Sequence, residues 1–135
     1  MAEERLLLMR SGDGRFALSM EEVLAVMDAP VKRPLPKCKA WCSGWVAFQD
    51  QVVPVLGGEG YSSLGPITML VIIERQGVLL GLPCQEATIS FGVSCDNSDE
   101  EPSAGLPAAS EAEVNGKGRA VRPDLRKLYS VLGIQ

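Results

Sequence analysis

Cysteine is the residue type that most readily supplies chemistry in this chain of 135 residues. Cys38 and Cys42 are spaced C-x3-C, and two further thiols, Cys84 and Cys95, follow much later. Four thiolates can hold a structural zinc ion, but the second pair lacks the short spacing of a zinc knuckle. Buried free cysteines are the simpler interpretation, and a zinc site built from all four remains an alternative.

The sequence contains no histidine, so it lacks the commonest general base and a common metal ligand. Gly57, Gly58 and Gly60 follow an apolar run, but no Lys-Ser or Lys-Thr pair follows to complete a phosphate-binding loop. Trp41 and Trp45 lie four residues apart, and packing in a core or at a rim accounts for both. We therefore predict no catalytic residues, no metal site and no cofactor.

The net charge of -4 is unevenly distributed along the chain. The stretch from Asp96 to Glu113 contains six acidic residues and no Lys or Arg, which leaves the remainder close to neutral. Nucleic-acid-binding domains usually carry a strongly basic face, so the composition argues against a nucleic-acid partner. A local basic cluster over 32–39 is best explained as a solvated loop.

The apolar runs of the sequence do not predict membrane insertion. The N-terminal stretch MAEERLLLMR starts with acidic residues and has too short an apolar run for a signal peptide. The run Ile67–Ile73 is also too short to cross a bilayer. Reduced thiols fit the cytoplasm, so we expect a cytoplasmic protein.

Short strands dominate the elements that must position any functional side chain. One hairpin is predicted around the turn Ser11–Gly14, and a second around the turn Gln49–Gln51. The apolar run Ile67–Ile73 predicts a strand that is buried on both faces. About eight or nine short strands are expected in total, a number and spacing typical of small barrels.

Two segments near the C-terminus differ from this pattern. Residues 96–118 are rich in Ser, Pro, Ala, Gly and acidic residues without an apolar period, which predicts a mobile acidic loop that adds little to stability. Residues 123–133 predict a helix, because Leu125, Leu128 and Leu132 share one face and Gly133 is a natural C-cap.

Pro54 lies inside the apolar run that returns from the second predicted turn. Proline lacks the N–H that a sheet ladder requires, so it is usually confined to edge strands and bulges. We therefore expect the strand to leave its ladder partway, at a barrel rim where a partner docks.

The segment SGWVAFQDQVVPVLG resembles the signature of the CheW-like domain family, in which a VPV strand closes a hairpin after a polar turn. The matching residues are Gly44, Val46, Val52, Pro54 and Val55. Three other segments resemble the family in the same order: FALSMEEVLAVMDAPVKRPLP, ITMLVIIERQGVLLGL and VRPDLRKLYSVL. The resemblance therefore spans nearly the whole chain.

The resemblance implies a mainly β fold of two small five-stranded SH3-like barrels packed together, with a C-terminal helix. Residues 1–135 form a single CheW-like domain in this interpretation. Its first barrel is expected over 16–60, its second over 66–122 and its helix over 123–133.

The resemblance also implies a non-catalytic adaptor that couples a chemoreceptor, a methyl-accepting chemotaxis protein, to a CheA-type histidine kinase. In the family the kinase contacts barrel edges and exposed apolar residues, and the receptor tail contacts a groove near the hairpin turn. On this basis the predicted partner-binding residues are Val23, Val26, Gly44, Val46, Phe48, Gln49, Asp50, Val52 and Pro54.

The chain departs from the family pattern at charged positions. The hairpin turn usually carries Arg-Gly, where this chain has Gln49 and Asp50. A Glu of the family is replaced by Ala25, and an Asp by Gly57. We therefore expect the fold and the kinase contact to be kept and the receptor contact to be weakened. The alternatives are an SH3-like interaction module outside chemotaxis and the cysteine-based zinc protein.

Overall fold

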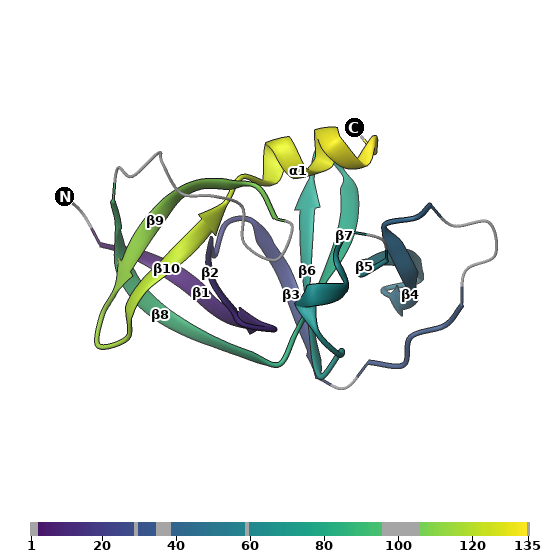
Figure 1. Cartoon of the computed structure of the whole chain (residues 1–135). Helices are drawn as coiled ribbons and strands as arrows, with labels where there is room; N and C mark the ends of the chain where they lie inside the picture. Colours follow the sequence, from purple (N-terminus) through teal and green to yellow (C-terminus); the bar gives the residue numbers. More distant parts are fainter. Residues whose placement is uncertain (1–2, 29, 35–38, 59, 96–105, 135) are drawn as a thin grey trace.

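The computed structural model describes residues 3–28, 30–34, 39–58, 60–95 and 106–134. Ten strands, one short 3-10 helix and one α-helix lie in this part of the chain (Figure 1). The strands are β1 (Glu4–Ser11), β2 (Gly14–Ser19), β3 (Val23–Asp28), β4 (Cys42–Phe48), β5 (Gln51–Leu56), β6 (Met69–Arg75), β7 (Val78–Cys84), β8 (Glu86–Cys95), β9 (Ala108–Val114) and β10 (Gly118–Pro123). The helices are η1 (Ser62–Leu64) and α1 (Leu125–Leu132).

The strands form two five-stranded units that lie side by side, with α1 across both (Figure 1). The first is a closed barrel with the order β1-β2-β10-β9-β8. The second is a sheet with the order β3-β6-β7-β5-β4, which has β3 and β4 as its two edges among the described residues. The predicted fold class, mainly β with two five-stranded units and a C-terminal helix, is confirmed.

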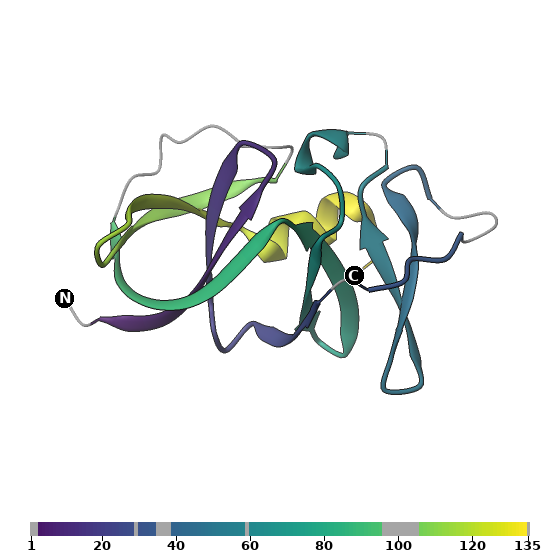
Figure 2. The same cartoon turned by 90° about the horizontal axis from the view of Figure 1, so that it is seen from below.

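The two units do not coincide with the predicted lobes 16–60 and 66–122. The N-terminal hairpin of β1 and β2 completes the barrel of β8, β9 and β10, and strands β3 to β7 form the other sheet (Figure 2). β1 pairs with β8 from Glu4, opposite Gly92, to Arg10, opposite Glu86. The apolar pattern of a strand does not specify a partner so distant in the sequence, which is why the predicted boundaries were wrong.

A single hydrophobic cluster joins the barrel, the sheet and the helix. Its buried members include Leu7, Met9, Phe16 and Leu18 from the barrel, Val71, Ile73 and Leu80 from the sheet, and Leu128 and Tyr129 from α1. A separate cluster fills the barrel with Leu6, Leu8, Ala17, Ala112, Val114 and Ala120. Successive residues of β1 thus serve two cores, because neighbouring side chains on a strand point to opposite faces.

The helix α1 closes the cluster between the two units. The Asp124 side chain caps its N-terminus by accepting a hydrogen bond from the Lys127 N–H at 3.0 Å, and Gly133 ends it in the left-handed conformation. The buried Tyr129 hydroxyl donates to the carbonyl of Val78 at 2.9 Å. Burial raises the pKa of Tyr129 well above its ordinary value, so the hydroxyl keeps its proton and this bond.

A set of hydrogen bonds around Gln85 holds the turn of the N-terminal hairpin against the sheet. The Gln85 Oε1 accepts from the Gly12 N–H at 2.6 Å, and its Nε2 donates to the carbonyls of Leu64 and Pro66 at 3.1 and 2.6 Å. The buried Ser11 Oγ donates to the carbonyl of Pro83 at 2.7 Å. These bonds fix the hairpin of the barrel on the loop that leads into β6.

The predicted acidic loop over 96–118 is wrong for its C-terminal half. Residues 108–114 form β9, which pairs with β8 and β10, and Gly118 begins β10. Ala112 and Val114 point into the barrel, and Glu113 points to solvent. Small and acidic residues hide this alternation from a pattern search, because alanine gives a weak apolar signal. Residues 96–105 lie outside the described residues.

Pro54 lies in β5, which is an interior strand of its sheet, so the predicted edge position is wrong. Pro54 stays in register opposite Trp45. The Trp45 N–H donates to the Arg33 carbonyl at 2.9 Å, and the Trp45 carbonyl accepts from the Arg33 N–H at 2.8 Å. Both backbone groups of Trp45 therefore point away from β5, so Trp45 and Pro54 form a pair without ladder bonds between them. On the other side, β5 pairs with β7 only at Val55, opposite Gly81. The missing N–H of Pro54 therefore removes no ladder bond.

We predict that Val71→Ala lowers the free energy of unfolding by about 1–3 kcal/mol, because it removes buried methyl groups and leaves a cavity. Val71 is fully buried in the cluster between the two units. Urea denaturation measures the change, and Val31→Ala, at a position that is 74% exposed, is the control. Equal midpoints for the two variants would show that β6 is not buried as described.

A second prediction concerns β9. Ala112→Asp places a carboxylate inside the barrel, at a cost of several kcal/mol, and should abolish most of the folded protein. Glu113→Ala changes the adjacent, exposed position and should leave stability within about 0.5 kcal/mol. Circular dichroism during thermal unfolding compares the two. A folded Ala112→Asp variant with an unchanged midpoint contradicts the burial of β9.

Candidate functional site

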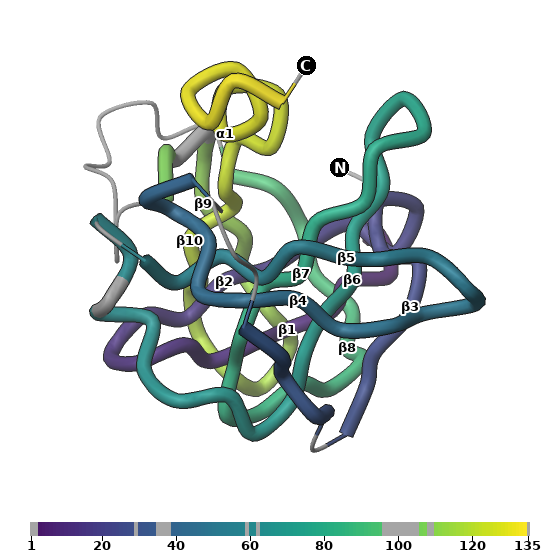
Figure 3. Tube along the Cα trace, turned by 90° about the vertical axis from the view of Figure 1, so that its right-hand side faces the viewer, coloured from purple at the N-terminus to yellow at the C-terminus, as the bar shows by residue number. Residues whose placement is uncertain are grey.

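The hairpin of β4 and β5 projects from the second sheet and ends in a two-residue turn (Figure 3). Both turn residues have positive φ, 49° at Gln49 and 63° at Asp50. Two positive φ values define a type I′ turn, whose twist matches that of the flanking strands. Glycine and asparagine are the usual residues there, so Gln49 and Asp50 hold an unfavourable backbone conformation at an exposed position.

The two faces of the hairpin have different environments. Val46, Val53 and Val55 are buried in the cluster on one face of the sheet, and Phe48 packs against it. The opposite face carries two cross-strand pairs, Trp45 with Pro54 and Ala47 with Val52. Ala47 and Val52 are exposed, and Trp45 and Pro54 are partly so. We call these four residues, Trp45, Ala47, Val52 and Pro54, the outer strip of the hairpin.

The edge of β4 is partly covered by an extended segment. Arg33 forms a two-bond bridge with Trp45. A Cβ on Gly44 would lie 2.5 Å from the Arg33 carbonyl oxygen, closer than real contacts allow. Glycine at this position therefore permits the close approach of the segment around Arg33 to β4.

The other edge strand, β3, exposes two larger apolar side chains. Leu24 is 45% and Val26 is 40% exposed, whereas Val23 packs against the central cluster. Val26 lies opposite the buried Val71, and a register shift falls between Val23 and Ala25. This register shift is a β-bulge in β3. Bulges commonly interrupt the pairing of edge strands and redirect a side chain. In the turn before it, the Ser19 N–H donates to the Glu22 carboxylate at 3.3 Å and the Glu22 N–H donates to the Ser19 carbonyl at 2.9 Å.

The structure places the predicted partner-binding residues in three settings. Gln49, Asp50, Val52 and Val26 are exposed, and Phe48, Pro54 and Val23 are partly buried. Val46 is only 1% exposed and Gly44 is buried, so both support the hairpin from within and present no side chain to a partner. Sequence reasoning missed Trp45 and Leu24. Residues two apart on a strand share a face, so the pairs Trp45 with Ala47 and Val52 with Pro54 could have identified the outer strip.

The cysteines do not form a metal site in the described part of the chain. Cys42 and Cys84 are buried, Cys95 is partly exposed, and no group of three or more potential ligands occurs among the described residues. Burial raises the pKa of the Cys84 thiol to about 11, which keeps it protonated near neutral pH. Cys38 of the proposed zinc set lies outside the described residues. No helix in the described part is long and apolar enough to cross a membrane.

The turn geometry leads to a stability prediction. Asp50→Gly should raise the free energy of unfolding by roughly 0.5–1 kcal/mol, because glycine adopts positive φ without steric cost. Asp50→Ala keeps that cost and is the matched control. Urea denaturation of both variants gives the comparison. An alanine variant at least as stable as the glycine variant would contradict the I′ turn.

Comparison with known proteins shows a family match and a similar solved structure for this chain. The sequence profile of the CheW-like domain matches residues 5–121, which is most of the chain. A search of curated proteins found no match. Among solved structures, the crystal structure of the scaffolding protein TtCheW from Thermoanaerobacter tengcongensis is similar, at 14% sequence identity and a TM-score of 0.69. The similarity covers 98% of this chain and 96% of that chain.

The structural likeness shows the same fold of two SH3-like subdomains, and the profile match covers strands of both units. The family is one of non-catalytic scaffolds, in agreement with the prediction that the chain is no enzyme. The ordered set of segments from FALSMEEV to VRPDLRKL is thus explained by common ancestry: the chain belongs to the CheW-like domain family.

Proposed function

We propose that the chain is a signalling adaptor that binds a CheA-type histidine kinase and has only a weak contact with a chemoreceptor tail. One observation carries the proposal: exposed apolar side chains are retained on the strand edge and the hairpin, while the turn between β4 and β5 has no cation. Apolar contacts then supply the kinase affinity, and the charged contact to the receptor is missing.

The kinase contact is assigned to β3. Leu24 and Val26 expose apolar surface on an edge strand that is anchored by the packed Val23. Burying a fully exposed side chain of this size contributes about 1.5–3 kcal/mol, so these two partly exposed side chains supply one part of the kinase affinity. The bulge near Ala25 fixes where these side chains point, which favours a partner of defined shape.

The receptor contact is assigned to the turn. Gln49 is exposed at the tip and offers only neutral hydrogen bonds, and Asp50 beside it adds a negative charge. A hydrogen bond to a charged group contributes about 1.5–3 kcal/mol, against about 1 kcal/mol for a neutral one. The difference corresponds to roughly tenfold in affinity for the receptor tail.

The kinase contact is tested by Leu24→Asp and Val26→Asp. Each should weaken binding to the kinase at least about tenfold, since a carboxylate would have to be desolvated at the contact. Val131→Asp, on the outer side of α1 at a position that is 66% exposed, is the matched control and should bind like the parent protein. Titration calorimetry gives the affinities. Equal losses in all three variants, or none, contradict the assignment to β3.

The receptor contact is tested by Gln49→Arg. It should strengthen binding to the receptor tail roughly tenfold at low salt and leave kinase binding and stability unchanged. Repeating the titration at higher salt should reduce the gain, because exposed charges are screened. Tight receptor binding by the parent protein without any gain in the variant contradicts the weakened contact. If neither partner binds, the chain is an SH3-like interaction module outside chemotaxis.

A further inference from the structure

Three cationic side chains meet at one end of the closed barrel, around a cavity of about 260 Å³. Arg10 comes from β1, Arg15 from β2 and Lys117 from the turn between β9 and β10. A single carboxylate, that of Glu86, accompanies them. The remaining lining residues are Leu8, Met9 and Thr88.

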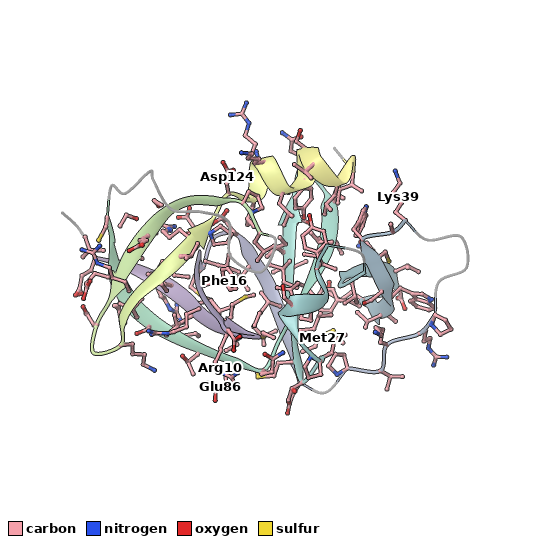
Figure 4. The ribbon with its side chains drawn as sticks, viewed as in Figure 1. Arg10, Phe16, Met27, Lys39, Glu86 and Asp124 are labelled. Atoms are coloured by element: carbon pink, nitrogen blue, oxygen red, sulfur yellow. The ribbon has the colours of Figure 1, made fainter. Side chains whose placement is uncertain are left out.

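The strand register explains why these residues meet. Arg10 lies opposite Arg15 on β2 and opposite Glu86 on β8, and Leu8 lies opposite Thr88. Leu8 belongs to the cluster that fills the barrel, and Arg10 is the next residue of β1 on the same face. The cavity is therefore the mouth of the barrel, a common place for small ligands in β proteins. Figure 4 shows Arg10 and Glu86 side by side at this end.

Two of the three cations have donors to spare. Arg15 is committed, because its guanidinium donates to the backbone carbonyls of Lys117 and Arg119 and so holds the β9–β10 turn. Arg10 uses only its Nε, which lies 3.4 Å from the Glu86 carboxylate. Within the described part of the chain, the Arg10 Nη atoms and the Lys117 Nζ have no hydrogen-bond partner.

The charge of the mouth is unbalanced. Three cations face one carboxylate, and the two arginines lie directly opposite each other on neighbouring strands. Like charges in directly opposite positions destabilise an antiparallel pair. A dianion in the cavity would balance the charge and satisfy the free donors of Arg10 and Lys117 together.

We propose that the mouth of the barrel binds a phosphate dianion, either free or as the phosphate group of a small phosphomonoester. The planar guanidinium of Arg10 matches two phosphate oxygens, and the Lys117 ammonium supplies a compact charge from the opposite side. Leu8 lines the same cavity and would contact an apolar body attached to the phosphate. This site lies on the barrel, apart from the β3 edge and the β4–β5 hairpin of the second sheet.

The site is tested by nuclear magnetic resonance titration of the full chain with inorganic phosphate and with phenyl phosphate, at ionic strength matched with chloride. The largest shifts should appear at the amides of Arg10, Thr88 and Lys117. Arg10→Gln and Lys117→Gln should each weaken binding about tenfold, whereas Arg126→Gln on the exposed side of α1 should not. Glu86→Gln should tighten binding, because it removes the competing carboxylate.

Arg10→Lys keeps the charge and removes the planar fork, so it should bind between the parent and Arg10→Gln. Thermal unfolding of each variant without ligand establishes that it is folded. Tighter binding of phenyl phosphate than of phosphate identifies a phosphomonoester as the occupant, and equal binding identifies free phosphate. Shifts spread over all exposed cations, or unaltered binding by a folded Arg10→Gln, Lys117→Gln double variant, overturn the proposal.

Discussion

The packing of two strand units and one helix on a shared cluster is the constraint on which the rest of this molecule depends. Each unit has a smaller cluster of its own, but Leu7 and Met9 of the barrel and Val71 and Ile73 of the sheet are buried together in the shared cluster. α1 closes this cluster, and the Tyr129 hydroxyl ties it to the β6–β7 hairpin. The exposed positions are consequently fixed by the buried ones. Val52 points away from the core because its neighbour Val53 is buried, and Val26 shares the face of its buried partner Val71 but is exposed because β3 is an edge strand.

The two units present different kinds of surface, an apolar one on the second sheet and a polar one on the barrel. The second sheet offers apolar side chains on an edge and on a hairpin, which suits contact with another protein. The barrel offers a small polar mouth, where Arg10 follows Leu6 and Leu8 on the inward face of β1. The family relationship concerns the scaffold as a whole, since the profile match spans both units.

Much of the scaffold was predictable from the sequence. Continuous apolar runs such as the one that becomes β6, the Ser11–Gly14 turn and the stripe of α1 are local signals, and the structure contains each of them. The errors share one cause, which is that pairing is not local. The partner of β1 is the distant strand β8, and β9 consists mainly of alanine and glutamate. Pro54 is accommodated by the register of β5 against β4 and β7. All residues of the predicted site came from the family resemblance, which does not separate the exposed Gln49 and Val52 from Val46, whose side chain faces inward.

The order of strands in the barrel has a consequence for synthesis on the ribosome. The first hairpin emerges early, but its barrel partners β8 to β10 are among the last strands made. The sheet of β3 to β7, in contrast, is formed by one uninterrupted stretch of chain between Val23 and Cys84. Long-range pairing is slow because a large loop must close first, so we expect the middle of the chain to acquire structure while both ends wait. The hairpin of β1 and β2 is then the segment that waits longest for its remaining partners, β8 and β10, and nascent-chain chaperones would act on it.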